Sequence, residues 1–415
     1  MSGEVTARRL LIAAACLLGS MFVPYVQATI GPLMLLPMTG EFGWTRTEFA
    51  FATTFLFVSG SITVLVFGKI ADRFGPRVIL VAGAVAGGAT MLLLSKQDAH
   101  LWRLYLAYAL LGACGSSGLG YTKIIGSLFS RHRGKALAIF GAESTIALAT
   151  LPLLTNALIE RVGWRQTYVV YGIIMWVVTP ILWFVVRGPG ISTPTAPPAS
   201  AAAAAVPASM MEGLTPAEIR RDGKFWIVVL TAVLGSGLSA GLLAHMIPAI
   251  TDKGFTPGVA ASVMSTSMFV GLVGTLVVGF AMDHFRTARV LSVFGLTAAL
   301  GYALLAVSSA AFGGLPLLIT ALSLQRIAMS AMQPGTTYVQ TRFVGIRSFG
   351  EAFGMQVLVT GIAMGVAPPL FGIVFERTGS YDPMYWVLCA AAVAGAALYF
   401  ALGPYRFAIK PPKAA

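Results

Sequence analysis

Gly68-Lys69-Ile70-Ala71-Asp72-Arg73-Phe74-Gly75-Pro76-Arg77 is the stretch that decides the fold of this chain. It separates two strongly apolar segments, near 48–71 and 78–95. Each segment has about the 20 residues that a helix needs to cross the hydrocarbon of a membrane. Three basic side chains and one acid cannot lie in lipid. We therefore expect a tight aqueous turn between two transmembrane spans, with Gly75-Pro76 ending the first helix.

Two further residues of this turn predict contacts. Gly68 has no side chain, so a neighbouring backbone can approach it closely. Asp72 faces the membrane from the turn, where it is suited to accept hydrogen bonds from the N-terminus of another helix. An ordinary basic loop would explain the cations but not this spacing.

The composition is that of a polytopic membrane protein. Of the 415 residues, 57% are hydrophobic and only 10% are charged, whereas a soluble domain carries about 25% charged residues. A net charge of +13 is compatible with nucleic-acid binding. The cations, however, lie in short loops between apolar segments, which is the positive-inside pattern of membrane proteins. The three cysteines fall inside apolar segments and are expected to be free thiols.

The apolar segments predict an all-α integral membrane protein with twelve transmembrane helices. Most of the 28 lysines and arginines lie at the termini and in alternate loops, which predicts that both termini are cytoplasmic. The first segment follows Arg8-Arg9 but continues to about Met38 without a small-residue cleavage site, so we expect a retained span. The segments lie near 10–38, 48–71, 78–95, 101–129, 135–158, 166–187, 225–250, 258–282, 290–308, 315–340, 351–375 and 384–403.

The middle of the chain predicts a linker between two bundles of six helices. Residues 191–209 are rich in proline and alanine, which is typical of a semi-flexible linker. Thr215-Pro216-Ala217-Glu218 then has an N-cap, a proline at N1 and a glutamate at N3, so a short amphipathic cytoplasmic helix should follow. We expect an N-terminal bundle at 1–187, the linker at 188–224 and a C-terminal bundle at 225–415.

The two bundles are copies of one repeat. A shift of 211 residues aligns 37–80 with 248–291 without a gap. Coincident glycines, prolines and aspartates are the informative matches, because apolar matches are common by chance in membrane proteins. Each copy has six spans, so the copies are parallel repeats. The identical pairs are Pro37/Pro248, Gly43/Gly254, Thr45/Thr256, Gly60/Gly271, Gly68/Gly279, Asp72/Asp283, Phe74/Phe285 and Leu80/Leu291.

The turn resembles the signature loop of the major facilitator superfamily, Gly-x-x-x-Asp-Arg-x-Gly-x-[Arg/Lys]. The resemblance implies two six-helix bundles around a central cavity, with the loop as part of a gate. The second copy is degraded and keeps only Gly279 and Asp283. Asp72 and Asp283 would anchor their loops to the N-termini of the eleventh and fifth spans. The matching residues in the first copy are Gly68, Asp72, Arg73, Gly75 and Arg77.

Three further stretches are similar to the branch that holds monocarboxylate transporters and oxalate/formate antiporters. They are residues 129–136, 163–168 and 342–350. Carriers of this branch typically have charged residues in the eighth span, but 262–282 has none here. An acidic residue at the first span and a lysine in the eleventh are also missing. The particular carboxylate therefore stays open.

Charges inside spans are candidate functional residues, because burying them in a membrane is costly. Arg326 lies near the middle of the tenth span. In the fold that the sequence resembles, the first, fourth, seventh and tenth spans line the cavity, which implies that Arg326 contacts the substrate. Its forked guanidinium suits a carboxylate. A structural ion pair or a stack on an aromatic ring is the alternative. Gly115, its partner by the 211 shift, offers no acid.

Lys123 and Glu143 are the other two charges within spans. They lie at similar depths on adjacent antiparallel helices, eight residues before Arg131 and eight after Lys135. One interpretation is a structural ion pair in which each charge neutralises the other. The second is proton coupling, because burial shifts the pKa of both residue types. Lys123 is also a candidate substrate contact.

Several polar side chains on the predicted spans complete the candidate site. His245, near the outer end of the seventh span, is either a hydrogen-bonded structural residue or takes part in gating or proton uptake. The remaining substrate-binding candidates are Gln27, Tyr25, Tyr121, Tyr338 and Gln333.

These features predict a secondary active transporter that moves a small organic anion, a monocarboxylate or related carboxylate, across a bacterial inner membrane. Alternating access and proton coupling are expected from the resemblance. The alternative is a proton-driven exporter of drugs or other small molecules. We expect no enzyme, because metal-ligand motifs and paired intramembrane carboxylates are missing. We expect no cofactor, metal or nucleic acid, and a monomer whose partners are substrate, protons and the lipid bilayer.

Overall fold

The computed structural model describes residues 7–24, 26–129, 133–187, 213–285, 287–345 and 347–407. In the first half of the chain these residues form seven helices. Glycines with a positive φ break the helical path at two places: Gly75, with a φ of 84°, lies between α3 and α4, and Gly163, with a φ of 80°, makes a kink inside α7. The helices are α1 (Ala7–Phe22), α2 (Val26–Phe42), α3 (Arg46–Phe74), α4 (Pro76–Leu94), α5 (Leu101–Gly115), α6 (Gly118–Leu128) and α7 (Arg133–Val185).

The second half begins with the predicted short helix. Thr215 caps α8, and Glu218 returns a hydrogen bond to the backbone of Thr215, so the capping box is confirmed. A five-residue π-helix then interrupts the seventh span. The elements are α8 (Pro216–Arg221), α9 (Gly223–Ala232), the π-helix η2 (Val233–Gly237), α10 (Leu238–Asp252), α11 (Pro257–Phe285), α12 (Val290–Val307), α13 (Gly314–Val344), α14 (Phe349–Thr378) and α15 (Asp382–Ala401).

These helices confirm the predicted fold of twelve membrane spans. Nine helical segments in the described part of the chain are long and apolar enough to cross a membrane. The first span is divided between α1 and α2 and the fourth between α5 and α6, so their pieces are too short to be counted singly. The kink at Gly163 divides α7 into the fifth and sixth spans. The chain is therefore a multi-pass membrane protein.

Two compact units can be distinguished in the chain. The first contains Met1–Ala196, Gly241–Phe269 and Pro368–Ser380, and the second contains Pro197–Ala240, Val270–Ala367 and Tyr381–Ala415. The first unit thus includes most of α10, part of α11 and the end of α14. The domain boundaries expected from the sequence, at 187 and 225, stay a prediction.

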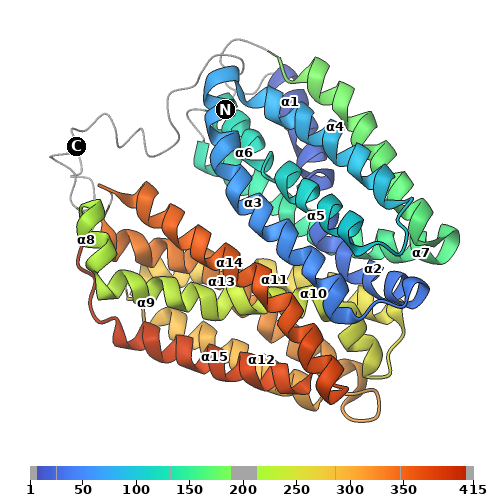
Figure 1. Cartoon of the computed structure of the whole chain (residues 1–415). Coiled ribbons are helices and arrows are strands. Elements are labelled where there is room, and N and C mark those ends of the chain that lie inside the picture. Colours follow the sequence, from blue (N-terminus) through green and yellow to red (C-terminus); the bar gives the residue numbers. More distant parts are fainter. Residues whose placement is uncertain are drawn as a thin grey trace. The chain divides into compact units, whose positions relative to one another are not determined.

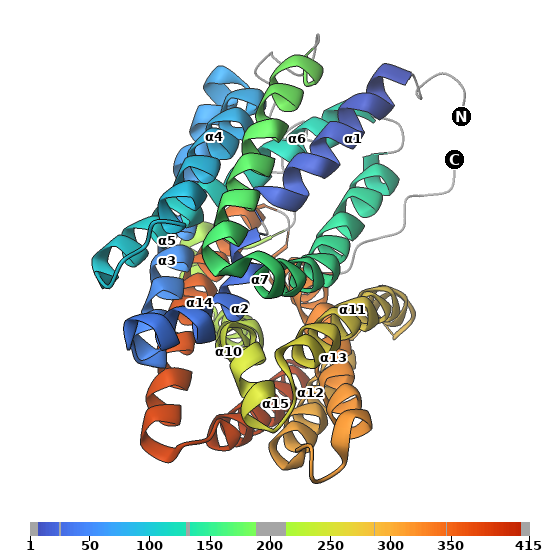
Figure 2. The same ribbon diagram turned by 90° about the vertical axis from the view of Figure 1, so that its right-hand side faces the viewer.

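In the first unit, α3 lies along α5 and α4 lies along α7 (Figure 2). Glycines allow the first of these contacts, because a Cβ atom on Gly112 would lie 2.1 Å from the carbonyl oxygen of Leu56. Ser116 reinforces it by donating a hydrogen bond of 2.9 Å to the carbonyl oxygen of Gly60. Close backbone approach through small residues is how helices pack in membranes.

In the second unit, α12 lies along both α13 and α15 (Figure 1). At one end of this unit, α8 covers α14: Ile219 is buried with Phe225 and Val344, and Arg220 donates a hydrogen bond of 2.7 Å to Glu351. The predicted amphipathic helix therefore buries its apolar side against the bundle.

Candidate functional site

Arg326 is a partly exposed cation on α13 of the second unit. Its Nε atom is buried without a hydrogen-bond partner, and no carboxylate in the described part of the chain forms an ion pair with it. The aliphatic part of the side chain lies over Gly271 of α11, where a Cβ atom would be 3.0 Å from Cγ of Arg326. A guanidinium held in this way has donors left for an anion.

A hydrogen-bonded network lies next to Arg326. The Ser239 hydroxyl lies 2.7 Å from the hydroxyl of Tyr302, and Gln325 donates a hydrogen bond of 3.3 Å to the same hydroxyl. Tyr302 interacts electrostatically with Arg326. Ser239 lies two residues after the π-helix Val233–Gly237, and such irregular turns occur often at functional sites. Sequence reasoning missed Ser239 and Tyr302, because neither interrupts the apolar pattern.

The internal repeat shows which residue of the first half corresponds to Arg326. Ser330 donates a hydrogen bond to the carbonyl oxygen of Gly271, just as Ser116 does to that of Gly60. Gly60 and Gly271 are equivalent, so Ser116 corresponds to Ser330, a shift of 214 residues. Arg326 therefore corresponds to Gly112 and not, as the shift of 211 predicts, to Gly115. The repeat still offers no acid at the equivalent position.

The first unit contains a buried polar group around Gln27. Tyr108 of α5 and Tyr168 of α7 interact with Gln27 of α2, and all three side chains are buried. Neither hydroxyl nor either amide atom of Gln27 reaches a regular hydrogen bond within the described residues. Such a group favours bound water or a polar group of a ligand. The tyrosines were not predicted, because a buried tyrosine resembles any aromatic core residue.

Two interrupted helices meet in the first unit. The first span breaks at Pro24, and the fourth breaks between Gly115 and Gly118. Cβ atoms on these two glycines would lie 3.8 Å from Pro24. Interrupted membrane helices expose backbone groups that regular helices satisfy internally, and transporters often bind their substrates at such places.

An ion pair ties α3 to α10 at one end of the first unit. Arg46 donates two hydrogen bonds to Asp252, and its guanidinium carbon lies 3.8 Å above the ring of Phe375 in α14. The backbone N–H of Thr47 donates a hydrogen bond of 2.8 Å to Glu376. We use the name outer lock for the five residues that make these contacts: Arg46, Thr47, Asp252, Phe375 and Glu376. It joins the N-terminal repeat to two helices of the C-terminal repeat.

His245 lies in the first unit and is fully buried. Its Nε2 atom is 3.0 Å from the carbonyl oxygen of Pro368, and its ring stacks on Phe371 with the centroids 6.0 Å apart. A hydrogen-bonded structural residue has such contacts, and a role of His245 in gating or proton uptake stays a prediction.

The signature turn is partly described. Gly75 makes the sharp bend that was predicted, and Arg77 donates a hydrogen bond to the carbonyl oxygen of Trp183 while stacking on its ring at 3.9 Å. Arg73 lies over Phe74, 5.2 Å from the ring centre. The close backbone approach predicted for Gly68 is not found among the described residues, because a Cβ atom there, as at Gly279, would meet nothing within 4 Å.

Three of the other candidates, Tyr338, Tyr121 and Lys123, lie among the described residues. Tyr338 lies twelve residues beyond Arg326 on the same helix, which is about 18 Å, and its hydroxyl accepts a hydrogen bond from Arg342. Tyr121 is buried against Gly19 of α1, and Lys123 is partly exposed on α6. Tyr25 and the side chains of Asp72, Glu143, Asp283 and Gln333 lie outside the described residues.

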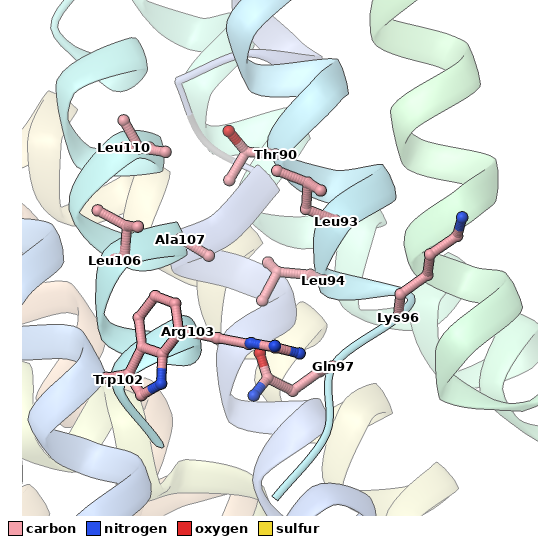
Figure 3. Close-up of a pocket in the computed structure, with 10 residues that line it drawn as sticks. All are labelled: Thr90, Leu93, Leu94, Lys96, Gln97, Trp102, Arg103, Leu106, Ala107 and Leu110. Atoms are coloured by element: carbon pink, nitrogen blue, oxygen red, sulfur yellow. The ribbon is translucent and has the colours of Figure 1, made fainter. Parts of the chain in front are cut away.

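A cavity of about 280 Å³ lies between α4 and α5 in the first unit (Figure 3). Four of the ten residues that line it are leucines, and Lys96, Trp102 and Arg103 stand at one end. None of the described substrate-binding candidates lines it.

Comparison with curated proteins points to carriers. The human "Monocarboxylate transporter 11" is 27% identical over 351 residues, which cover 80% of this chain and 70% of that protein. The "Uncharacterized MFS-type transporter YcxA" of Bacillus subtilis is 26% identical over 255 residues, which cover 60% of this chain and 59% of that protein.

Solved structures agree in fold. The nucleoside transporter NupG superimposes with a TM-score of 0.76 at 13% identity, covering 96% of this chain and 99% of NupG. A bacterial homolog of the human lysosomal transporter Spinster gives a TM-score of 0.71 at 16% identity, covering 96% of each chain. A family model described as Major Facilitator Superfamily matches residues 16–312 and 234–415. The chain is therefore similar to monocarboxylate transporters, belongs to the major facilitator superfamily and is a multi-pass transporter of a small molecule.

Proposed function

We propose that the protein is a secondary active transporter of a small organic anion, a monocarboxylate or related carboxylate, and that Arg326 binds the carboxylate. The observation that carries this proposal is that Arg326, a partly exposed residue, forms no ion pair with a carboxylate of the described residues, and that its Nε atom has no hydrogen-bond partner among them. A cation inside a membrane protein is costly without a counter-ion. A substrate anion that completes the site makes affinity and selectivity one interaction.

The side chain of Arg326 also lies against the eighth span. The eighth span, in α11, contains no charged side chain between Pro257 and Met282. Instead, Gly271 of α11 leaves space into which the side chain of Arg326 passes from α13. The names of the similar carriers specify monocarboxylates, and this supports a substrate with one carboxylate.

Alternating access is supported by the outer lock. The contacts of Arg46 with Asp252 and of Thr47 with Glu376 hold α3 against α10 and α14 at one end of the chain's spans. Their release would be needed for a substrate to enter from that end. We propose that the signature turns at Asp72 and Asp283 act as the opposite gate.

We further propose proton coupling through Glu143 and Lys123, and a location in a bacterial inner membrane with both termini cytoplasmic. The distribution of lysine and arginine over alternate loops supports this orientation. Buried lysine and glutamate are the residue types whose protonation a membrane site changes most readily. We expect the monomer to be sufficient for transport.

The direct test is uptake into proteoliposomes of labelled formate, acetate, lactate, benzoate and oxalate, with and without an inwardly acidic pH gradient. We expect saturable uptake of at least one monocarboxylate, stimulated by the gradient and lost in Arg326→Gln. Transport of a cationic dye in place of all carboxylates would instead identify an exporter. A carboxylate signal that the gradient does not change would remove proton coupling but not the anion.

A further inference from the structure

The cavity between α4 and α5 has an apolar wall that faces away from the core. Leu93 of α4 and Leu106 and Leu110 of α5 are 64%, 52% and 43% exposed. Both helices belong to spans of a membrane protein, so an exposed leucine there faces hydrocarbon and not water. Figure 3 shows Leu106 and Leu110 on one helix and Leu93 on the other, on facing sides of the cavity. This wall suits an acyl chain.

The other end of the cavity has the composition of a membrane interface. Trp102, Arg103 and Lys96 line it, and the guanidinium carbon of Arg103 lies 5.5 Å from the ring centre of Trp102. Tryptophan and basic residues are typical of the depth of lipid head groups. Asp98 pairs with Arg103 and offsets one charge. Lys96 forms no ion pair among the described residues, so this end carries a net positive charge.

The turn that presents these charges is held in place. Gln97 is buried and donates hydrogen bonds of 2.8 and 3.0 Å to the carbonyl oxygens of Asp98 and His100. The backbone carbonyl oxygen of Gln97 accepts a hydrogen bond of 3.1 Å from the guanidinium of Arg165. The basic end therefore needs little ordering when a ligand binds, which favours affinity.

We propose that this cavity binds one anionic phospholipid, with an acyl chain along Leu93, Leu106 and Leu110 and the phosphate at Lys96 and Arg103. Charge complementarity selects this occupant over a zwitterionic lipid, because a basic residue near the head groups attracts anionic lipid. The site is separate from Arg326 and does not depend on which substrate is carried.

The test is native mass spectrometry of the full-length protein released from nanodiscs of equal parts phosphatidylglycerol and phosphatidylcholine. One basic residue favours anionic lipid by about fivefold, and we expect at least that preference in the lipid retained by the wild type. Lys96→Gln and the double variant Lys96→Gln/Arg103→Gln should lose it. Arg161→Gln removes an exposed cation of α7 outside the cavity and is the matched control.

A second variant tests the apolar wall separately. Leu106→Trp fills the cavity without changing a charge, so it should reduce the retention of both lipids while leaving thermal unfolding in detergent near that of the wild type. An unchanged preference in the double variant, an equal loss in Arg161→Gln, or full retention in Leu106→Trp would each overturn the proposal.

Discussion

Arg46 binds Asp252 through both terminal nitrogens of its guanidinium, and this pair joins two helices that belong to different copies of the internal repeat. Asp252 corresponds to Glu41 in the first copy by the shift of 211 residues. Glu41, however, pairs with Arg165 of its own copy and accepts a hydrogen bond of 2.8 Å from Trp164. The two equivalent acids therefore make different contacts. Glu41 stabilises its own bundle, whereas Asp252 joins the two copies of the repeat.

Breaking the outer lock should favour the state in which this end is open. Partly exposed pairs contribute about 1 kcal/mol, so Arg46→Gln or Asp252→Asn should change the conformational equilibrium about fivefold. We expect an increase of this size in thiol labelling of Thr47→Cys, measured in a background without Cys16, Cys114 and Cys389.

The control for this experiment is Arg165→Gln. It breaks the ion pair of Glu41, the acid that corresponds to Asp252, and this pair lies within one copy of the repeat. It should lower thermal stability without raising the labelling of position 47. Equal labelling in the wild type and in both lock variants would show that the pair is not a gate.

Lowering the pH should weaken the ion pair between Glu41 and Arg165. Hydrogen bonds from Arg165 and Trp164 hold the pKa of Glu41, which lies beyond the predicted first span, below its usual 4.5. A carboxyl whose pKa is lowered by folding contributes stability at neutral pH, and this is lost as the pH falls through the folded pKa. The apparent Tm of the wild type should therefore fall below pH 4.5, and part of that fall should be missing in Glu41→Gln.

Gly271→Ala should disturb Arg326 without touching its charge. The new Cβ atom would lie 3.0 Å from Cγ and 3.4 Å from Cδ of Arg326, so the side chain has to move. We expect weaker carboxylate binding with an unchanged amount of folded protein. Gly354→Ala is the matched control, because a Cβ atom there meets nothing within 4 Å. Equal affinities in both variants would argue against a positioning role for Gly271.

Lys123 and Glu143 can be tested as a pair. If they neutralise each other, Lys123→Met or Glu143→Gln alone leaves a charge within a membrane span uncompensated and should reduce the yield of folded protein. The double variant should recover it, because replacing both partners of a buried pair is often neutral. A recovered double variant whose uptake ignores a pH gradient would support coupling, whereas additive defects would show that the residues do not interact.

The sequence predicts the parts of this protein that depend on local chemistry. The bend at Gly75 and the capping box of Thr215 and Glu218 follow from residues a few positions apart, and both are confirmed. The spans follow from apolar length alone. The outer lock could not be predicted in this way, because Arg46 and Asp252 are 206 residues apart and nothing local marks them as partners.

The candidate site likewise contains residues that the sequence predicts and residues that it does not. Arg326 is visible in the sequence because a charge inside a span is rare, but its neighbours Ser239 and Tyr302 are ordinary residues of apolar helices. The error of three residues in placing Gly115 opposite Arg326 has a similar cause. The gapless alignment of the repeat ends at residue 80 and does not reach the fourth span, so the spacing there has to be seen in the helix contacts.

The most direct test of the central claim is binding of the best-transported labelled monocarboxylate to purified wild type, Arg326→Lys and Arg326→Gln. Leaving one partner of a desolvated charge pair without the other costs about 2–5 kcal/mol, so Arg326→Gln should bind at least about 30-fold more weakly. Arg326→Lys should fall between the two, because an ammonium keeps the charge but not the forked contact. Unchanged affinity in Arg326→Gln, in protein that unfolds at the wild-type temperature, would contradict the account.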